Sequence, residues 1–272
     1  MGQRESQLPA PLTAEDLGAY ISSQDDFAFE REVYHKANGL GFSTDHAGLY
    51  EDPVTNKARQ YDIRASKTVN DQRICLTIEC KGLSASYPLL VSCVPRSLAE
   101  SFHEVLYTDT VQGVGGSYTR VALKKRLHRA GDPVGKSMRQ VRRDHRGELT
   151  SGDEVFDKWM QALASAADLI RDAADQLSAP ASGKPRYVAV LPVLVVSDET
   201  LWVADYASNG RLQRAPFTVS DITFYLGRKY ELPRERLTFT ISHLHVYTRS
   251  NVHTLFEQIA GGGGIWPELF DS

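Results

Sequence analysis

The segment Gln72–Lys81 constrains the fold more than any other, because it has the alternating pattern of a β-strand and ends in two charged residues. Side chains alternate between the two faces of a strand. One face is apolar, with Ile74, Leu76, Ile78 and Cys80, and the other carries Thr77, Glu79 and Lys81. A carboxylate and an ammonium group therefore stand side by side at the end of an otherwise apolar strand.

Hydrophobic periodicity and breaker residues predict the elements around this strand. A capping-box pattern at Thr13 and Asp16 predicts a helix that begins at Ala14, and Gly39 is a natural stop for a second helix. The second helix is expected over 25–38. We expect further helices at 97–106, 136–146, 153–177 and 252–260. We expect strands at 41–50, 58–69, 72–81, 88–94, 187–197, 201–206, 222–230 and 237–247. The strand at 201–206 is expected to be the hairpin partner of the strand at 187–197. Most of 107–135 reads as loop and 179–184 as a linker.

The order of helix, three strands, helix and strand predicts an α/β sandwich around a mixed sheet. We divide the chain into a flexible tail at 1–12, a core at 13–208 with a basic insertion around 107–146, and a β-rich C-terminal extension at 209–272. The extension is expected to pack on the core as one compact unit, with a flexible end from Gly261.

Composition excludes several classes of protein. The three cysteines have no CxxC spacing and are odd in number, so free thiols in a reducing compartment are expected rather than disulfides or a zinc site. The N-terminus lacks the apolar core of a signal peptide. The longest apolar run, Tyr187–Val196, is about half the length needed to cross a bilayer. These features predict a cytoplasmic protein without a membrane partner.

A second acidic residue, Asp62, lies on the strand before Gln72–Lys81 and faces the same way as Arg64. Two adjacent antiparallel strands can bring Asp62 and Glu79 together. Two close carboxylates repel each other unless a cation lies between them, and Mg²⁺ suits all-oxygen ligands. The alternative is a simple salt bridge, in which Lys81 pairs with one of the two carboxylates.

Glu30 adds a third carboxylate. At about 100° per residue it falls within the apolar arc of the helix at 25–38, which contains Phe27, Val33, Tyr34 and Ala37. A lone buried carboxylate costs several kcal/mol unless it is paired or binds a metal. A Glu30–Lys81 ion pair would satisfy this requirement, but three carboxylates and one lysine leave excess negative charge that a metal ion would neutralise.

The string Tyr61-Asp62-Ile63-Arg64-Ala65, followed by Ile78-Glu79-Cys80-Lys81 and preceded by a helix with Glu30, resembles the PD-(D/E)XK nuclease superfamily. The resemblance covers about residues 25–81 and extends through the following helix and strand to 197. It implies a restriction-endonuclease-like core, a mixed β-sheet flanked by helices in the order αβββαβ. Tyr61 stands where the family name implies proline.

By this resemblance the protein is a Mg²⁺-dependent nuclease, in which Mn²⁺ is expected to substitute. The metal ligands would be Asp62, Glu79, the carbonyl of Cys80 and Glu30, and Lys81 would orient water or support developing negative charge. The family often has a Gln or Lys on the helix after the Glu-x-Lys strand, which makes Gln140 and Lys136 candidates. DNA is expected ahead of RNA as the partner, and a homodimer is left open.

A basic segment between Arg120 and Arg146 strengthens the nucleic-acid prediction. Ten basic and two acidic residues give 10 − 2 = +8 in a chain of net charge −3, so the remainder carries −3 − 8 = −11. Such asymmetry suits contact with a phosphate backbone. The alternative is a solvated helix face beside a mobile loop. The residues expected to bind nucleic acid are Lys124, Lys125, Arg126, Lys136, Arg139, Arg142 and Arg143.

Other motifs are weaker. Gly113-x-Gly115-Gly116 lacks the Lys-Ser/Thr of a phosphate loop, and His243 and His245 alternate on a strand without acidic or cysteine neighbours. Two rival functions remain: a catalytically inactive nucleic-acid-binding module of the same fold, and an interaction protein in which the acidic residues and Lys81 form a buried ion network.

Overall fold

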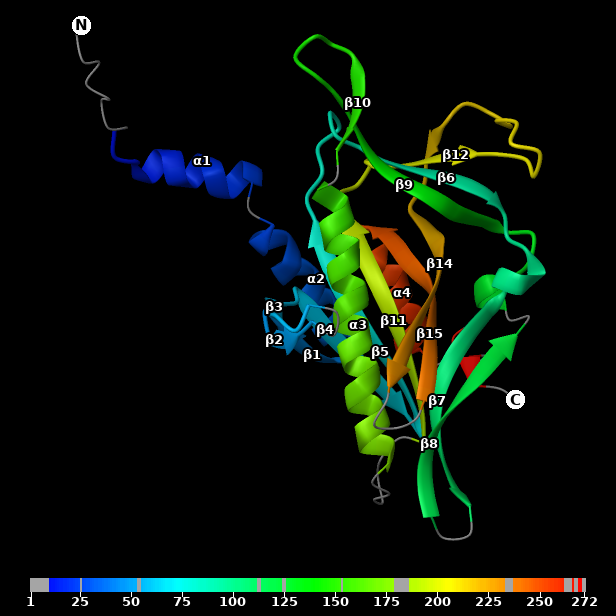
Figure 1. Ribbon diagram of the computed structural model, residues 1–272. Coiled ribbons are helices and arrows are strands. Elements are labelled where there is room, and N and C mark those ends of the chain that lie inside the picture. The colour runs from blue at the N-terminus through cyan, green and yellow to red at the C-terminus, as the bar shows by residue number, and fades with distance from the viewer. Residues whose placement is uncertain are drawn as a thin grey trace, which may run out of the picture.

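The computed structural model describes residues 10–24, 26–52, 55–111, 114–123, 126–152, 154–178, 186–232, 237–261, 266 and 269–270. The α-helices are α1 (Ala14–Gln24), α2 (Phe27–Gly39), α3 (Glu154–Ser178) and α4 (Val252–Ala260). Figure 1 shows α1 projecting away from a body built on a large sheet, with α3 on the near side of the sheet and α4 behind it. In the described part of the chain, no helix is both long and apolar enough to span a membrane.

The strands of the N-terminal half are β1 (Ser43–His46), β2 (Leu49–Glu51), β3 (Ala58–Gln60), β4 (Ile63–Val69), β5 (Gln72–Lys81), β6 (Leu89–Pro95), β7 (Phe102–Val111), β8 (Val114–Leu123), β9 (Pro133–Arg143) and β10 (Leu149–Gly152). Those of the C-terminal half are β11 (Tyr187–Val196), β12 (Leu201–Asp205), β13 (Phe217–Thr218), β14 (Asp221–Leu232) and β15 (Leu237–Thr248). All except the β2–β3 pair join one mixed sheet, ordered β1-β4-β5-β11-β15-β14-β9-β6-β12-β13, with β7, β8 and β10 attached at its sides.

The core lies on both faces of β11, at the centre of this sheet. β11 pairs in parallel with β5 along its whole length, from Tyr187 opposite Gln72 to Val196 opposite Lys81. Val188 and Val190 pack in a cluster with residues of α3, whereas Leu191 and Val193 pack in a cluster with residues of α2 and α4. Because helices cover both faces, β11 is apolar at nearly every position, as expected for a parallel strand buried on two sides.

The prediction for Gln72–Lys81 is confirmed residue for residue, and those for α3, α4 and the Thr13–Asp16 capping box are also confirmed. The expected strand at 41–50 is two strands, divided at Ala47, which has a φ of 58°. The expected strand at 58–69 also divides, so that Asp62 lies in the short connection between β3 and β4.

Two expected helices are wrong. Residues 97–106 contain one short 3-10 turn, Leu98–Glu100, with a Ser97–Glu100 capping box, and then enter β7. Residues 136–146 lie mainly in β9, which pairs with β6 on one side and β10 on the other. Tertiary strand pairing overrode local helix signals in both segments. The expected loop at 107–135 contains the β7–β8 hairpin and the start of β9.

The C-terminal segment belongs to the same sheet. β15 lies beside β11 in parallel and pairs antiparallel with β14, whose register shifts between Tyr225 and Arg228. The expected hairpin of 187–197 with 201–206 is wrong, because β12 pairs in parallel with β6 instead. The tail at 1–9, the linker at 179–184 and Gly262–Gly264 lie outside the described residues.

Candidate active site

Asp62 and Glu79 come together at neighbouring ends of β4 and β5. Ile63 pairs with Ile78, so the residues that flank this pair, Asp62 and Glu79, lie opposite each other. The Asp62 backbone N–H donates to Glu79 Oε1 at 3.4 Å, and the Cys80 backbone N–H donates to Asp62 Oδ2 at 2.8 Å. Asp62 is 7% exposed and Glu79 is fully buried. The strand pairing thus holds two carboxylates against each other in a low-dielectric environment.

The polar face of β5 lies beneath α3. Thr77 Oγ1 donates to the Ala162 carbonyl at 3.0 Å, and Arg64 of β4 forms a 2.8 Å ion pair with Asp168 of α3. These contacts hold α3 across the ends of β4 and β5. They place Lys158 of α3 over the carboxylates of Asp62 and Glu79.

Lys158 is the cation of the site. Its Nζ donates to Asp62 Oδ1 at 3.0 Å and to Oδ2 at 2.9 Å, and it lies 3.6 Å from Glu79 Oε2. Burial by itself would lower the pKa of Lys158, but the charges of Asp62 and Glu79 outweigh burial and raise the pKa above its ordinary value. Lys158 therefore remains an ammonium group that neutralises part of the charge of both carboxylates.

Burial dominates the electrostatics of Glu79. Desolvation, followed by the negative charge of Asp62, raises the pKa of Glu79 well above its ordinary value, and Lys158 opposes the shift. Glu79 Oε2 accepts no hydrogen bond within the described part of the chain. A buried carboxylate oxygen without a donor is costly unless a cation approaches it.

Glu30 faces the same cleft from α2. The cleft measures about 440 Å³ and is lined by Glu30, Arg59, Gln60, Asp62, Lys158 and Gln161. Burial, and then the charge of Asp62, raise the pKa of Glu30. Its Oε2 lies 3.1 Å from His46 Nε2, so the alternative Glu30–Lys81 ion pair does not form.

Lys81 lies at the end of β5 but contacts a different carboxylate. Its Nζ is 3.3 Å from Asp26 Oδ2, and Asp26 Oδ1 accepts the Gly82 backbone N–H at 2.7 Å. The alternative salt bridge between Lys81 and Asp62 or Glu79 is therefore absent, and Lys158 contacts these two carboxylates instead.

Gln140 and Lys136 do not reach the cleft, because their segment is strand β9 and not a helix. Gln140 is buried and donates from Nε2 to the Tyr87 carbonyl at 3.3 Å. Lys136 pairs with Glu100 and lies over the Tyr225 ring. The expectation that they stand on the helix after β5 is wrong.

The helix that follows β5 at the site is α3, and two of its residues, Lys158 and Gln161, line the cleft although they were not predicted from the sequence. The signal was present: Val155, Lys158 and Ala162 lie on one helical face, and Val155 and Ala162 are buried. A lysine within an apolar arc carries the same information as Glu30 does in α2.

Asp62 and Glu79 offer only oxygen atoms as ligands, which fit a hard divalent cation. Glu79 Oε2 is also free to bind one, because it accepts no hydrogen bond from the described residues. In the same described residues, no group of three or more His, Cys, Asp or Glu side chains is placed so that it could hold a metal ion. Lys158 lies where such a cation would interact with both carboxylates. Cys80 contributes a backbone N–H to Asp62, and its thiol is fully buried.

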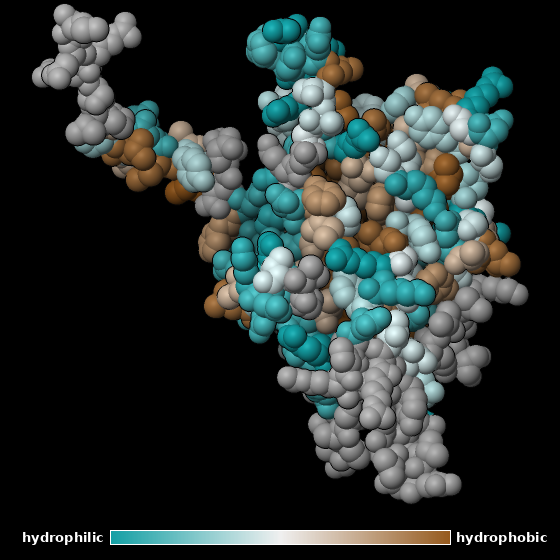
Figure 2. Space-filling model, in the orientation of Figure 1, coloured by the Kyte–Doolittle hydropathy of each residue, from teal (hydrophilic) through white to brown (hydrophobic). Residues whose placement is uncertain are grey.

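The basic segment forms mainly the β9–β10 hairpin, which extends from the body in Figure 1 and has a mostly hydrophilic tip in Figure 2. Arg139, Arg142 and Arg143 are exposed on it, and Arg143 donates to the Gly147 carbonyl at 2.8 Å. Lys124 and Lys125 lie outside the described residues, as does the side chain of Arg126. The helical face expected for this charge is wrong, but three of the arginines do face solvent.

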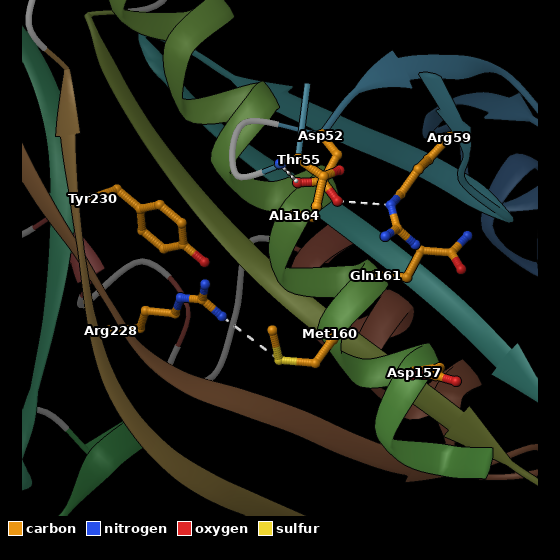
Figure 3. A pocket seen from close by; sticks show the side chains of 9 residues that line it. All are labelled: Asp52, Thr55, Arg59, Asp157, Met160, Gln161, Ala164, Arg228 and Tyr230. Atoms are coloured by element: carbon orange, nitrogen blue, oxygen red, sulfur yellow. Dashed lines mark hydrogen bonds and ion pairs between the residues drawn. The ribbon is translucent and has the colours of Figure 1, made fainter. Parts of the chain in front are cut away.

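A second pocket, of about 150 Å³, adjoins the cleft, with which it shares Arg59 and Gln161 (Figure 3). Arg59 pairs with Asp52 at 2.7 Å. Figure 3 shows Arg228 and Tyr230 of β14 directed toward α3, where Arg228 approaches Met160 Sδ at 3.6 Å. The polar lining thus continues from the carboxylates along one side of α3.

Comparison with known proteins adds no relative: no family model, no curated protein and no solved structure matches this chain.

Proposed function

We propose that this protein is a metal-dependent nuclease of the PD-(D/E)XK type, which hydrolyses phosphodiester bonds of nucleic acid. The observation that carries the proposal is the buried pair of Asp62 and Glu79, of which Asp62 lines a cleft together with Glu30 and Lys158. Carboxylates are held together in this way at a high electrostatic cost, and such clusters of perturbed groups are typical of functional sites.

The arrangement of elements supports the same proposal. α2, β1, β4, β5, α3 and β11 follow one another in the order αβββαβ, with β6 to β10 inserted before α3. β1, β4 and β5 are antiparallel neighbours, and β11 is parallel to β5. This order and pairing support the restriction-endonuclease-like core that the sequence resemblance implies.

Mg²⁺ is the proposed cofactor, held by Asp62 and Glu79, with the Cys80 carbonyl as a further ligand by resemblance. When bound, the ion would lower the pKa of water and stabilise negative charge on the phosphate. Glu30 would hold a second ion or its waters. Lys158 would move from the carboxylates toward the phosphate, where its ammonium group supports developing charge. Lys81, held by Asp26, would orient the attacking water.

The proposed substrate is DNA. The exposed arginines of the β9–β10 hairpin can contact the phosphate backbone. The two adjoining pockets contribute Arg59 and Arg228 on the cleft side of α3. Together these surfaces supply positive charge near a site that is itself acidic.

The test uses purified protein with single- and double-stranded DNA and RNA, in Mg²⁺, in Mn²⁺ and in EDTA. We expect cleavage of at least one substrate in either metal and none in EDTA. Cleavage that survives EDTA would overturn the metal mechanism.

A second candidate is a nucleic-acid-binding module without catalysis. The observation that favours it is Lys158, whose ammonium group already contacts both carboxylates. This candidate predicts binding that is independent of metal, and no cleavage of any of the four substrates.

A further inference from the structure

The second pocket, which lies beside the acidic cleft and along α3, holds two polar side chains of β14 (Figure 3). We call it the β14 pocket. Arg228 and Tyr230 both point into it, toward α3. The Tyr230 hydroxyl oxygen is buried and has no hydrogen-bond partner within the described residues. Buried polar atoms are nearly always paired, so this exception requires an explanation, and one explanation is that the hydroxyl group serves to bind a ligand.

Arg228 is a half-buried cation without a counterion in the described part of the chain. Its guanidinium group forms no ion pair there, and it donates a hydrogen bond to Met160 Sδ at 3.6 Å. A thioether sulfur is a weak acceptor, so most of the five N–H donors of the guanidinium group remain available. The guanidinium carbon lies 5.4 Å from the centroid of the Tyr230 ring. This contact holds the charge of Arg228 beside the Tyr230 side chain.

The two carboxylates that line the β14 pocket do not neutralise Arg228. Asp52 forms an ion pair with Arg59 at 2.7 Å. Asp157 is exposed to solvent, and in Figure 3 its carboxylate is directed away from Arg228. The positive charge of Arg228 is therefore available to a ligand in the pocket.

Arg228 and Tyr230 follow a β-bulge in β14. The register between β14 and β15 shifts between Tyr225 and Arg228, and Gly227 has a φ of 56°, which favours glycine. Bulges bend a strand and re-aim its side chains, and they are over-represented next to active sites. Arg228 and Tyr230 are two residues apart, so they share one face of the strand. The bulge therefore sets the direction in which both side chains leave β14.

The chemistry of these two side chains selects an anion with several acceptor atoms. Burial raises the pKa of Tyr230 to about 12, so its hydroxyl group remains protonated at physiological pH and can donate. A guanidinium group binds phosphate oxygens through paired, charge-assisted hydrogen bonds. The pocket volume of about 150 Å³ corresponds to roughly five water molecules at about 30 Å³ each, which is room for one phosphate group.

The β14 pocket is continuous with the acidic cleft, because Arg59 and Gln161 line both. The residues of α3 that line the pocket extend from Asp157, next to Lys158, to Ala164. At about 1.5 Å per residue, the pocket reaches about 9 Å along the helix from the level of Lys158. Successive phosphates of one DNA strand are about 3.4 Å apart along the duplex axis. A strand bound at the carboxylates can therefore place a neighbouring phosphate in the pocket.

On the basis of the nuclease function proposed above, we propose that Arg228 and Tyr230 bind a phosphate group of the nucleic-acid strand, one to three positions from the phosphate that is cleaved. Arg228 donates N–H groups to the phosphate oxygens, and Tyr230 adds a hydroxyl hydrogen bond. Neither residue touches the reacting atoms, so both are positioning residues. They hold the strand so that the scissile phosphate lies over Asp62 and Glu79.

The first experiment requires no cleavage. It measures the melting temperature of the wild type, Arg228→Met, Tyr230→Phe and Arg214→Met in EDTA, in inorganic phosphate and in chloride of equal ionic strength. The matched control is Arg214, whose side chain is 60% exposed and lies outside both pockets. Phosphate stabilises folded proteins in general by exclusion from their surface, so the site-specific part is the difference between variants. A ligand that binds only the folded state raises the melting temperature by mass action.

We expect the wild type and Arg214→Met to gain more from phosphate than Arg228→Met does. Tyr230→Phe keeps the ring and should lose part of the gain, which keeps the test decisive if Arg228→Met does not fold. Equal gains in all four proteins would overturn the proposal.

The second experiment measures DNA affinity in EDTA by fluorescence anisotropy, and KM and kcat for cleavage in Mg²⁺. Arg228→Met should bind DNA about tenfold more weakly, the effect of losing one charge-assisted hydrogen-bonded contact, and its slope of log affinity against log salt should fall by about one. KM should rise more than kcat falls, because a positioning contact is lost. Duplexes with and without a 5′-phosphate should show the same dependence on Arg228 if the pocket holds an internal phosphate, and a dependence confined to the phosphorylated duplex identifies a terminal phosphate.

The two proposals fail in different ways. DNA affinity and salt slope of Arg228→Met equal to those of the wild type would overturn the phosphate pocket, whether or not the protein cleaves. Binding of DNA and of phosphate that depends on Arg228, without cleavage in Mg²⁺ or Mn²⁺, would support the pocket and contradict the proposed catalysis.

Discussion

Replacement of Lys158 by methionine removes the ammonium group that contacts both buried carboxylates and keeps most of the side-chain volume. In the wild type, Lys158 Nζ lies 2.9 Å from Asp62 and 3.6 Å from Glu79. The variant leaves Asp62 and Glu79 facing each other without that cation. We expect the metal-free protein to lose stability because these two carboxylates then repel each other in a buried environment.

The magnitude follows from the distances. At an effective dielectric constant of 20, the two attractions are roughly 6 and 5 kcal/mol for 2.9 Å and 3.6 Å. The variant no longer desolvates an ammonium group, which offsets part of this loss, and loss of one partner of a buried pair usually costs about 3–5 kcal/mol. The Lys158 side chain is 23% exposed, so we expect the lower end of that range, about 3 kcal/mol.

The loss depends on pH in a defined direction. The folded-state pKa of Glu79 is raised, so its protonation stabilises the folded state as pH falls. Without Lys158 that pKa rises further, and protonation of Glu79 relieves the repulsion. The variant should therefore lose more stability at pH 8 than at pH 5.5.

The assay is urea denaturation of wild type and Lys158→Met in EDTA at both pH values, repeated with Mg²⁺. Added Mg²⁺ should stabilise the variant more than the wild type, because the ion no longer competes with an ammonium group. Lys36→Met is the control, since Lys36 pairs with Glu32 on the same face of α2, with side chains 26% and 36% exposed, and neither partner is a buried carboxylate. It should lose no more than about 1 kcal/mol. A variant as stable as wild type at pH 8, or one that ignores Mg²⁺, would refute this reasoning.

Burial lowers the folded-state pKa of His245 to about 3 and that of His103 to about 4, below the ordinary value of 6.5. The unfolded chain therefore takes up protons first as pH falls, and urea denaturation between pH 7 and pH 5 should show a loss of about 1.4 kcal/mol per histidine for each pH unit below 6.5; a flat profile would contradict the burial of neutral rings. Arg139→Ala with Arg142→Ala should lower the slope of log affinity for DNA against log salt by about two, and Arg214→Ala, at another exposed arginine, should leave it unchanged; equal slopes for all three proteins would exclude the hairpin from the interface. Leu191→Ala, at a fully buried position of β11, should cost about 2–5 kcal/mol in thermal or urea unfolding, and a cost no larger than that of Leu149→Ala at an exposed position would contradict the central placement of β11.

The centre of the fold could be predicted because its elements carry strong local patterns. Gln72–Lys81 alternates over ten residues, and Tyr187–Val196 is apolar throughout because helices cover both faces of β11. The periphery could not be predicted in the same way. β9 lies between β6 and β10 and approaches β14 at Gly135, where a Cβ atom would meet Val91 and Phe224. Such strand pairing is non-local and leaves little trace in the residues themselves.

The residues of the candidate site also differ in whether they could be predicted from the sequence. Asp62 and Glu79 could be placed together because the strand register brings them opposite each other, and Asp62 lines the same cleft as Glu30. Lys158 comes from a helix about eighty residues further along the chain, and only the packing of α3 on β5 reveals it. The contact between the rings of His128 and His245 likewise required the fold, since the two residues are remote in sequence.

We propose above that Asp62 and Glu79 form the catalytic centre of a metal-dependent nuclease. The most direct measurement compares wild type with Glu79→Gln for cleavage of end-labelled DNA in Mg²⁺, with DNA binding measured by fluorescence anisotropy on the same preparations. We expect Glu79→Gln to bind DNA like the wild type and not to cleave it. Its melting temperature in EDTA should be equal to that of the wild type or higher, because the repulsion between Glu79 and Asp62 is removed. Cleavage by Glu79→Gln at the wild-type rate, or a wild type that binds DNA and never cleaves it in Mg²⁺ or Mn²⁺, would contradict metal-dependent catalysis at Asp62 and Glu79.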